Sequence, residues 1–190
     1  TVQGNSLDNT LVGGAGTDTL SFSGATGSVN IDLVNNTTTG DGTDIISGFE
    51  KYIGSDLADI LVKNSVSEAF TEFDAGTNSN GLDIADYSSA TSDITVEING
   101  SSVTLSEGGN SDIVKNVEVI KTGEGDDTYN ITDITGIDTL DAGGGNNILT
   151  SDVDDLSGVV LLGFNTITAQ DGQTITLDAT DLDDKTIHLD

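Results

Sequence analysis

The sequence is marked first by what it lacks. Its 190 residues include no cysteine, proline, methionine, tryptophan or arginine, and a single histidine. The absence of cysteine excludes disulfide bridges and cysteine-ligated zinc as sources of stability. No run of residues approaches the ~20 apolar positions of a membrane-spanning helix. We therefore expect no membrane insertion, and a fold that is stabilised by something other than disulfides.

Basic residues are scarce as well. The chain has 33 acidic and 5 basic residues and a net charge of −28. Such a chain repels itself, and cations that neutralise part of the charge should make compaction easier. The same charge argues against nucleic acid and anionic membranes as partners. A bound metal ion could then replace the missing disulfides as the stabilising element.

The cationic groups are also poorly placed for catalysis. Enzymes that act on uronates need cationic groups near the substrate carboxylate and a base of suitable pKa. The five lysines are scattered, and His188 lies in an alternating segment where a strand residue is the better interpretation. Asp126-Asp127 is the densest acidic pair within a motif, but a turn explains it better than a pair of catalytic carboxylates. We expect no catalytic residue and no enzymatic activity.

The apolar third of the residues falls in short runs of Val, Ile and Leu between Gly, Asn, Asp and Ser. This pattern is typical of strands and turns, and the few aromatic residues favour a narrow aliphatic core. Ser65 to Phe73 is the single helical candidate, with a strand or irregular excursion equally open. The expected core positions include Leu11, Leu20, Leu61, Leu140 and Leu149.

One nonapeptide stands out because it joins a metal-binding turn to a strand. Gly13 to Ser21 reads G-G-x-G-x-D-x-U-x, in which U is a large apolar residue. The glycines let backbone carbonyls converge on a cation, and the aspartate adds an anionic oxygen. Degenerate copies recur at Gly4–Val12, Gly54–Val62, Thr122–Asn130, Asp133–Asp141 and Ala142–Thr150.

A longer internal duplication spans about residues 4–62 and 75–130. An offset of 65 places Asp18 on Asp83, and after a short insertion an offset of 68 places Asp59 on Asp127. From residue 151 the glycine-aspartate turns give way to alternating strands. We therefore divide the chain into a repeat region, 1–150, and a segment, 151–190, that continues the strand stack without clear calcium motifs.

The repeat region resembles the repeats-in-toxin (RTX), or haemolysin-type, calcium-binding proteins over roughly residues 4 to 150. The resemblance implies a right-handed parallel β-roll or β-solenoid whose successive turns hold calcium. It also implies secretion by a type I system, and hence an extracellular or cell-surface location. The match is specific at Gly13 to Ser21 and looser in the other copies.

The same resemblance implies a set of calcium ligands. They are the carboxylates of Asp18, Asp59, Asp83, Asp127 and Asp138, the backbone carbonyls of Gly13, Gly14, Gly16, Gly123 and Gly125, and the amide oxygens of Asn9 and Asn147. The alternative is that these aspartates and asparagines only cap turns in a calcium-free solenoid.

Two roles fit these observations. The favoured one is a non-enzymatic structural or adhesive segment of a large secreted bacterial protein, such as an adhesin, a surface layer or a filament subunit. The alternative is an accessory calcium-binding module of a secreted toxin or polysaccharide-modifying enzyme. The chain opens inside a repeat-like phrase, so we expect it to be an excerpt whose copies or neighbouring repeats stack end to end. Calcium would fold the chain after export.

Overall fold

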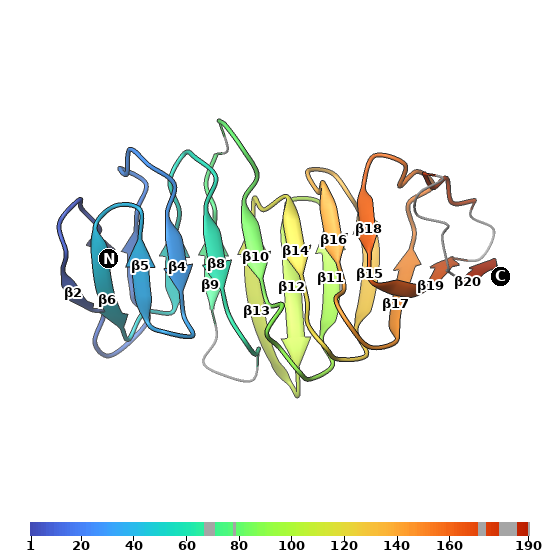
Figure 1. Cartoon of the computed structure of the whole chain (residues 1–190), viewed down its shortest axis with the longest axis horizontal. Coiled ribbons are helices and arrows are strands. Elements are labelled where there is room, and N and C mark those ends of the chain that lie inside the picture. The colour runs from blue at the N-terminus through green and yellow to red at the C-terminus, as the bar shows by residue number, and fades with distance from the viewer. Residues whose placement is uncertain (67–70, 78, 171–173, 179–185, 190) are drawn as a thin grey trace.

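The chain folds into an elongated stack of short strands that lie side by side along its long axis (Figure 1). The computed structural model describes residues 1–66, 71–77, 79–170, 174–178 and 186–189. These residues form 20 β-strands and no helix. The expected all-β class is confirmed, and the strands form two mostly parallel sheets that are compatible with the expected parallel β-roll.

The strands belong to two sheets of 11 and 9 strands, here called sheet A and sheet B. In spatial order sheet A contains β1 (Val2–Gln3), β3 (Thr19–Ser21), β7 (Lys51–Ile53), β9 (Glu72–Asp74), β13 (Asn110–Lys115), β12 (Ser102–Glu107), β11 (Thr95–Asn99), β15 (Thr128–Asp133), β17 (Asn147–Ser151), β19 (Phe164–Ala169) and β20 (Thr186–Leu189). Sheet B contains β18 (Val160–Leu162), β16 (Thr139–Asp141), β14 (Val119–Lys121), β10 (Ile84–Asp86), β8 (Ile60–Val62), β4 (Asn30–Asp32), β5 (Thr37–Thr39), β6 (Thr43–Ser47) and β2 (Thr10–Val12).

Inward-facing residues align across paired strands because side chains alternate along each strand. In sheet A, Leu20 pairs with Tyr52, which pairs with Phe73. In sheet B, Leu61 pairs with Ala85 of the next turn. These rows form one continuous core between the sheets. Four of the five leucines expected in the core, Leu20, Leu61, Leu140 and Leu149, are fully buried, whereas Leu11 is half-buried.

Two antiparallel meanders interrupt the parallel order, and the sequence analysis did not foresee them. Strands β4, β5 and β6 pair antiparallel in sheet B, and β11, β12 and β13 do the same in sheet A. The flanking strands of each meander pair parallel with the neighbouring turns. A hairpin strand carries the same alternating pattern as a solenoid strand, so periodicity alone does not distinguish them.

The two meanders occupy segments that the internal duplication aligns, yet they lie in opposite sheets. The chain crosses between the sheets five times from β3 in sheet A to β10 in sheet B. An odd number of crossings exchanges the two sheets between the aligned segments. Each sheet therefore gains two extra strands from one meander.

Glycine columns let successive turns approach to backbone contact. A Cβ atom added to Gly123 would lie 2.0 Å from the Ala90 carbonyl oxygen, and one on Gly143 would lie 2.3 Å from that of Gly123. Gly163 continues the column above Gly143. No real Cβ atom approaches a carbonyl oxygen so closely, so these positions require glycine.

Strand β9 covers the end of the Ser65–Phe73 candidate, and residues 67–70 lie outside the described residues. Strands β18, β19 and β20 lie in the segment after residue 151, and Asp155 forms an isolated parallel bridge with Thr176. His188 lies within β20.

Replacing Gly123 with alanine should destabilise the fold by about 3 kcal/mol, because the new methyl group overlaps the Ala90 carbonyl. Gly158→Ala is the matched control, because its added Cβ meets no atom within 4 Å, and it should change stability by less than about 0.5 kcal/mol. Urea unfolding measures both values. Equal stabilities of the two variants would contradict the close stacking of these turns.

Candidate cation sites in the stacked turns

Carboxylate and amide side chains lie at the N-terminal ends of successive strands. Before the strands of sheet A, the Ile94 N–H donates a hydrogen bond to Asp127 Oδ1 at 2.8 Å. The Asp127 N–H donates in turn to Asn147 Oδ1 at 2.7 Å, and the Asn147 N–H to Asn165 Oδ1 at 2.6 Å. Each side chain therefore accepts a backbone N–H from the preceding turn, which forms a polar ladder along the stack.

Sheet B carries an equivalent ladder. The Val29 N–H donates to Asp59 Oδ1 and the Asp59 N–H to Asp83 Oδ1, both at 2.6 Å. The Asp83 N–H donates to Glu118 Oε2 at 2.7 Å. Asp59 and Asp83 are fully buried. These ladders satisfy backbone donors that would otherwise be unpaired in the interior.

Asn147 shows what the inner side of such a turn contains. Its amide nitrogen, Nδ2, lies 2.9 Å from the Ala142 carbonyl oxygen and 2.7 Å from that of Gly144. It also lies 2.9 Å from the Gly163 carbonyl oxygen of the next turn. Three carbonyl oxygens from two turns thus converge on one donor group.

Asp127 stands 20 residues before Asn147, one turn earlier in the stack. Its Oδ1 accepts a backbone N–H in the same way as Asn147 Oδ1. Its second oxygen, Oδ2, is buried and has no hydrogen-bond partner. Burial raises the pKa of the Asp127 carboxyl, whereas the Thr122 side chain and the Ile94 N–H lower it. An acceptor oxygen therefore occupies the position in which Asn147 has its donor, and a positive charge there would be stabilising.

Asp83, which precedes strand β10 of sheet B, has the same kind of unpaired acceptor oxygen. Its Oδ2 is buried without a hydrogen-bond partner. Burial, together with the negative charges of Glu118 and Asp59, raises the pKa of the Asp83 carboxyl to about 7. A buried carboxyl with no cation beside it favours its neutral form. The Asp83 turn is thus a second place where a positive charge would be stabilising.

Asp59 is different, although it matches the repeat motif equally well. Its Oδ1 accepts from the Val29 N–H and the Ser55 hydroxyl, and its Oδ2 accepts from the Ser55 N–H at 2.5 Å. Burial raises the pKa of the Asp59 carboxyl, and these hydrogen bonds oppose the rise. Asp59 therefore caps its turn.

The other predicted ligands are less buried. Asp18 is half-buried, and its N–H donates to Glu50 Oε2 at 2.8 Å. Asn9 is also half-buried, and its Oδ1 accepts from the Asn5 amide. Asp138 is exposed and accepts from the Thr139 hydroxyl.

The predicted glycine ligands lie in the stacked turns. Gly14 and Gly16 have φ values of 106° and 109°, which favour glycine, and Gly13 packs against the Gly48 carbonyl. Gly123 and Gly125 are buried in the turn that leads to Asp127. The structure therefore brings together Asp59 with Asp83, and Asp127 with Gly123, Gly125 and Asn147.

Sequence reasoning missed three side chains that accept a backbone N–H of a predicted ligand, namely Glu50, Glu118 and Asn165. Glu50 and Glu118 coincide in the internal duplication, and each accepts the N–H of a predicted ligand, Asp18 or Asp83. Their alignment in the duplication was the sequence feature that could have identified them. Asn165 follows a glycine at a spacing shorter than the nonapeptide, which hid it.

The donor chemistry fits calcium better than a softer metal. No group of three or more His, Cys, Asp or Glu side chains that could hold a metal ion is present among the described residues. A site in these turns would instead consist of backbone carbonyls together with a carboxylate oxygen. Calcium takes six to eight such oxygen ligands in flexible geometry.

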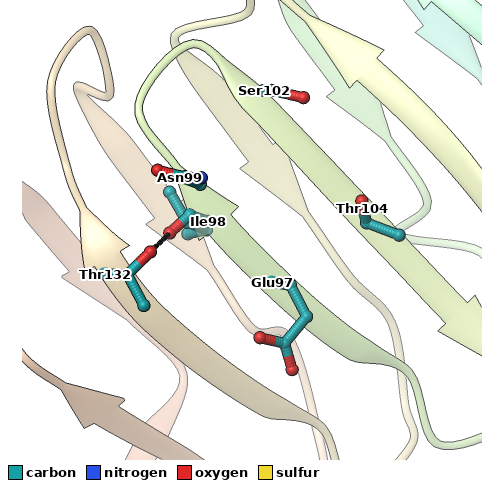
Figure 2. A pocket seen from close by; sticks show the side chains of 6 residues that line it. All are labelled: Glu97, Ile98, Asn99, Ser102, Thr104 and Thr132. Carbon is teal, nitrogen blue, oxygen red and sulfur yellow. Dashed lines mark hydrogen bonds between the residues drawn. The ribbon is translucent and has the colours of Figure 1, made fainter.

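An open hollow of about 310 Å³ lies on sheet A, away from the ladders (Figure 2). It is lined by Glu97, Ile98, Asn99, Ser102, Thr104 and Thr132. The Thr132 hydroxyl is already bonded to the Ile98 carbonyl oxygen. The lining residues offer hydrogen-bonding groups but no aromatic ring on which a sugar could stack.

No protein-family model matches the chain, and no match was found among curated proteins or solved structures. Among the described residues, no helix is long and apolar enough to cross a membrane.

Replacing Asp127 with asparagine should stabilise the metal-free protein by about 1 to 3 kcal/mol, because it removes a buried acceptor that has no partner. The new amide would donate to backbone carbonyl oxygens of its own turn, as the Asn147 amide does in the following turn. Urea unfolding in chelator measures the change. Asp138→Asn removes the same charge at an exposed position and is the control. A less stable Asp127→Asn protein would contradict the equivalence of the two turns.

The Asp83 carboxyl predicts an unusual pH dependence in chelator. Its folded-state pKa of about 7 exceeds the ~4 of an unfolded aspartate. Between these values the folded chain binds more protons, so its free energy of unfolding should increase as the pH falls from about 8 to about 5. Asp83→Asn should reduce this slope, and Asp138→Asn should keep it. Urea unfolding at several pH values measures both, and an unchanged slope in Asp83→Asn would contradict the assignment.

Proposed function

We propose that the chain is a non-enzymatic, calcium-stabilised structural or adhesive segment of a large secreted surface protein. One observation carries the proposal. Asp83 and Asp127 each hold a buried carboxylate oxygen without a partner, in turns stacked closely on their neighbours. A divalent cation bound between turns would neutralise both the carboxylate and the partial charges of the surrounding carbonyl oxygens.

Different residues of the chain would have different roles in such a site. Asp127 Oδ1 remains bonded to the Ile94 N–H, which orients the carboxylate and leaves Oδ2 available. The glycines at 123 and 143 bring backbone carbonyls of successive turns together. Asn147 provides the same cross-turn link through its own amide. The turn that ends at Asn147 would therefore close without metal, and the turn that ends at Asp127 would depend on it.

This arrangement suits a protein that is exported unfolded and becomes rigid outside the cell. In the absence of cations, the net charge of −28 and the many glycines favour an open chain. An ion that binds only the folded state at 100 times its dissociation constant adds about 2.7 kcal/mol of stability per site. A few sites could then decide whether the stack forms.

Thermal unfolding in chelator, in magnesium and in calcium tests the proposal, with particle size followed in parallel. Calcium should raise the melting temperature of the wild-type chain well above its value in magnesium. Asp127→Asn should lose much of this gain, and Asp152→Asn, which removes one charge at an exposed position outside the predicted ligand set, should keep it. Growth in particle size with calcium would add end-to-end assembly to the role. An identical melt in all three conditions would overturn the calcium mechanism.

A further inference from the structure

A lysine and an aspartate meet in the interior between the two sheets. Lys63 follows strand β8 of sheet B, and Asp112 lies in strand β13 of sheet A. Lys63 Nζ is 2.7 Å from Asp112 Oδ2, and their side chains are 4 % and 0 % exposed. In a chain with 33 acids, a lysine would find partners at the surface. Its burial against one carboxylate therefore needs a specific explanation.

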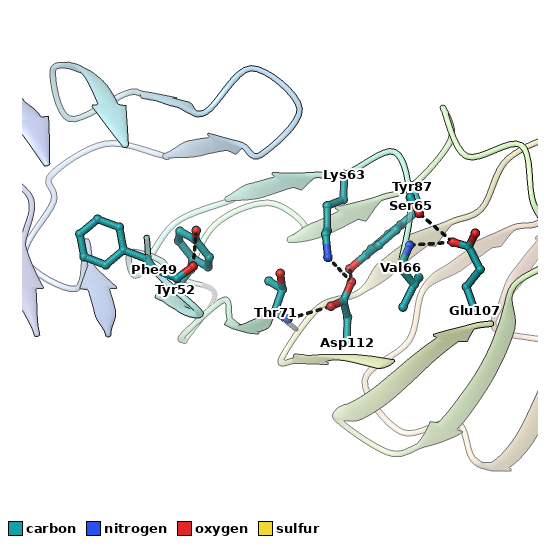
Figure 3. Close-up of polar contacts among 9 residues, drawn as sticks. All are labelled: Phe49, Tyr52, Lys63, Ser65, Val66, Thr71, Tyr87, Glu107 and Asp112. Atoms are coloured by element: carbon teal, nitrogen blue, oxygen red, sulfur yellow. Dashed lines mark hydrogen bonds and ion pairs between the residues drawn. The ribbon is translucent and has the colours of Figure 1, made fainter. Parts of the chain in front are cut away.

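Two further groups hold the Asp112 carboxylate, one on each oxygen. The Thr71 N–H donates to Oδ1 at 2.8 Å, and the Tyr87 hydroxyl donates to Oδ2 at 2.9 Å. Figure 3 shows Lys63, Tyr87 and Thr71 converging on Asp112. Burial raises the pKa of the Asp112 carboxyl, whereas the Lys63 ammonium and the hydrogen bonds lower it.

Burial makes the ionised pair costly. Removing two opposite charges from water carries a large desolvation penalty, which transfer of one proton from the amine to the acid relieves. A neutral amine held against a neutral carboxylic acid is the reactant pair for amide formation. Fixed proximity of this kind replaces a collision between separate molecules and greatly increases the effective concentration.

We propose that Lys63 and Asp112 condense into an intramolecular amide that links the two sheets covalently. A proton passes from Lys63 Nζ to Asp112 Oδ2, and the neutral nitrogen attacks Asp112 Cγ to form the N–C bond. Negative charge that develops on Oδ1 is held by the Thr71 N–H. The Cγ–Oδ2 bond then breaks, and a second proton from the nitrogen leaves with Oδ2 as water, which the Tyr87 hydroxyl stabilises by its hydrogen bond.

The reaction is balanced without an oxidant or cofactor, since one ammonium and one carboxylate give one amide and one water. Lys63 and Thr71 also line an open hollow of about 190 Å³, which provides a way out for the water. The bond would connect residues 49 positions apart. It would give this cysteine-free chain a covalent link between its sheets.

The first segment of the internal duplication provides a natural comparison. Asp44 aligns with Asp112, and its Oδ1 likewise accepts a backbone N–H, from Asn9. Its Oδ2 accepts from the Thr38 hydroxyl, whereas Asp112 Oδ2 receives the Lys63 ammonium. Phe22 stands where the second segment has Tyr87. The amine and the phenol are therefore present together only at Asp112 of this aligned pair.

Mass spectrometry of the purified full chain tests the proposal directly. The intact mass should be lower than the sequence mass by one water. Digestion with a protease that cuts after lysine should leave residues 52–115 as one uncut peptide, because an acylated Lys63 is no longer recognised. Lys63→Met should keep its full sequence mass, and Tyr87→Phe, which copies Phe22, should form the link more slowly.

Three results would overturn the proposal. The first is a full intact mass with normal cleavage after Lys63. The second is a loss of water confined to residues 64–115 with Lys63 still cleaved, which identifies a cyclised aspartate rather than a cross-link. The third is the same loss of water in Lys63→Met. An unchanged rate in Tyr87→Phe would remove the role assigned to the phenol.

Discussion

The structure depends on one constraint, which is that each turn of the backbone must lie in contact with the next. Close stacking brings carbonyl oxygens and backbone N–H groups of neighbouring turns into an interior that excludes water. The N–H groups at the strand beginnings are satisfied by carboxylate and amide side chains of the adjacent turn. Glycine is needed where a carbonyl approaches the α-carbon, as at Gly123 and Gly143. The motif that unites glycine with aspartate or asparagine expresses this constraint in the sequence.

Much of the fold follows from that motif and from the alternation of aliphatic residues. Leu20, Leu61, Leu140 and Leu149 lie in the core because each follows its turn by a fixed spacing. The meanders could not be predicted, because a strand that folds back carries the same alternation as one that continues the stack. The exchange of the aligned segments between the two sheets also depends on counting crossings, which a local pattern does not reveal.

The candidate site was predictable in position but less so in chemistry. Asp59, Asp127 and Asp138 occupy the same place in their nonapeptides, yet one is capped by Ser55, one has a buried unpaired oxygen and one is exposed. These differences arise from the neighbouring turn and from residues outside the shared motif. Glu118 illustrates the point, because it reaches Asp83 from 35 residues away. Nonapeptide spacing does not record such contacts.

Buried acceptor oxygens are stabilised in several different ways along the stack. A buried acceptor oxygen must face a positive or hydrogen-bearing group, and the chain supplies Ser55 for Asp59 and Lys63 for Asp112. At Asn147 it replaces the acceptor with an amide that donates to three carbonyls. Asp83 and Asp127 remain without such a group. A chain with five basic residues has few cations of its own to bury, so under the proposed function these two positions would take a cation from the solution. The stability of the stack would then depend on the ion content of the surroundings.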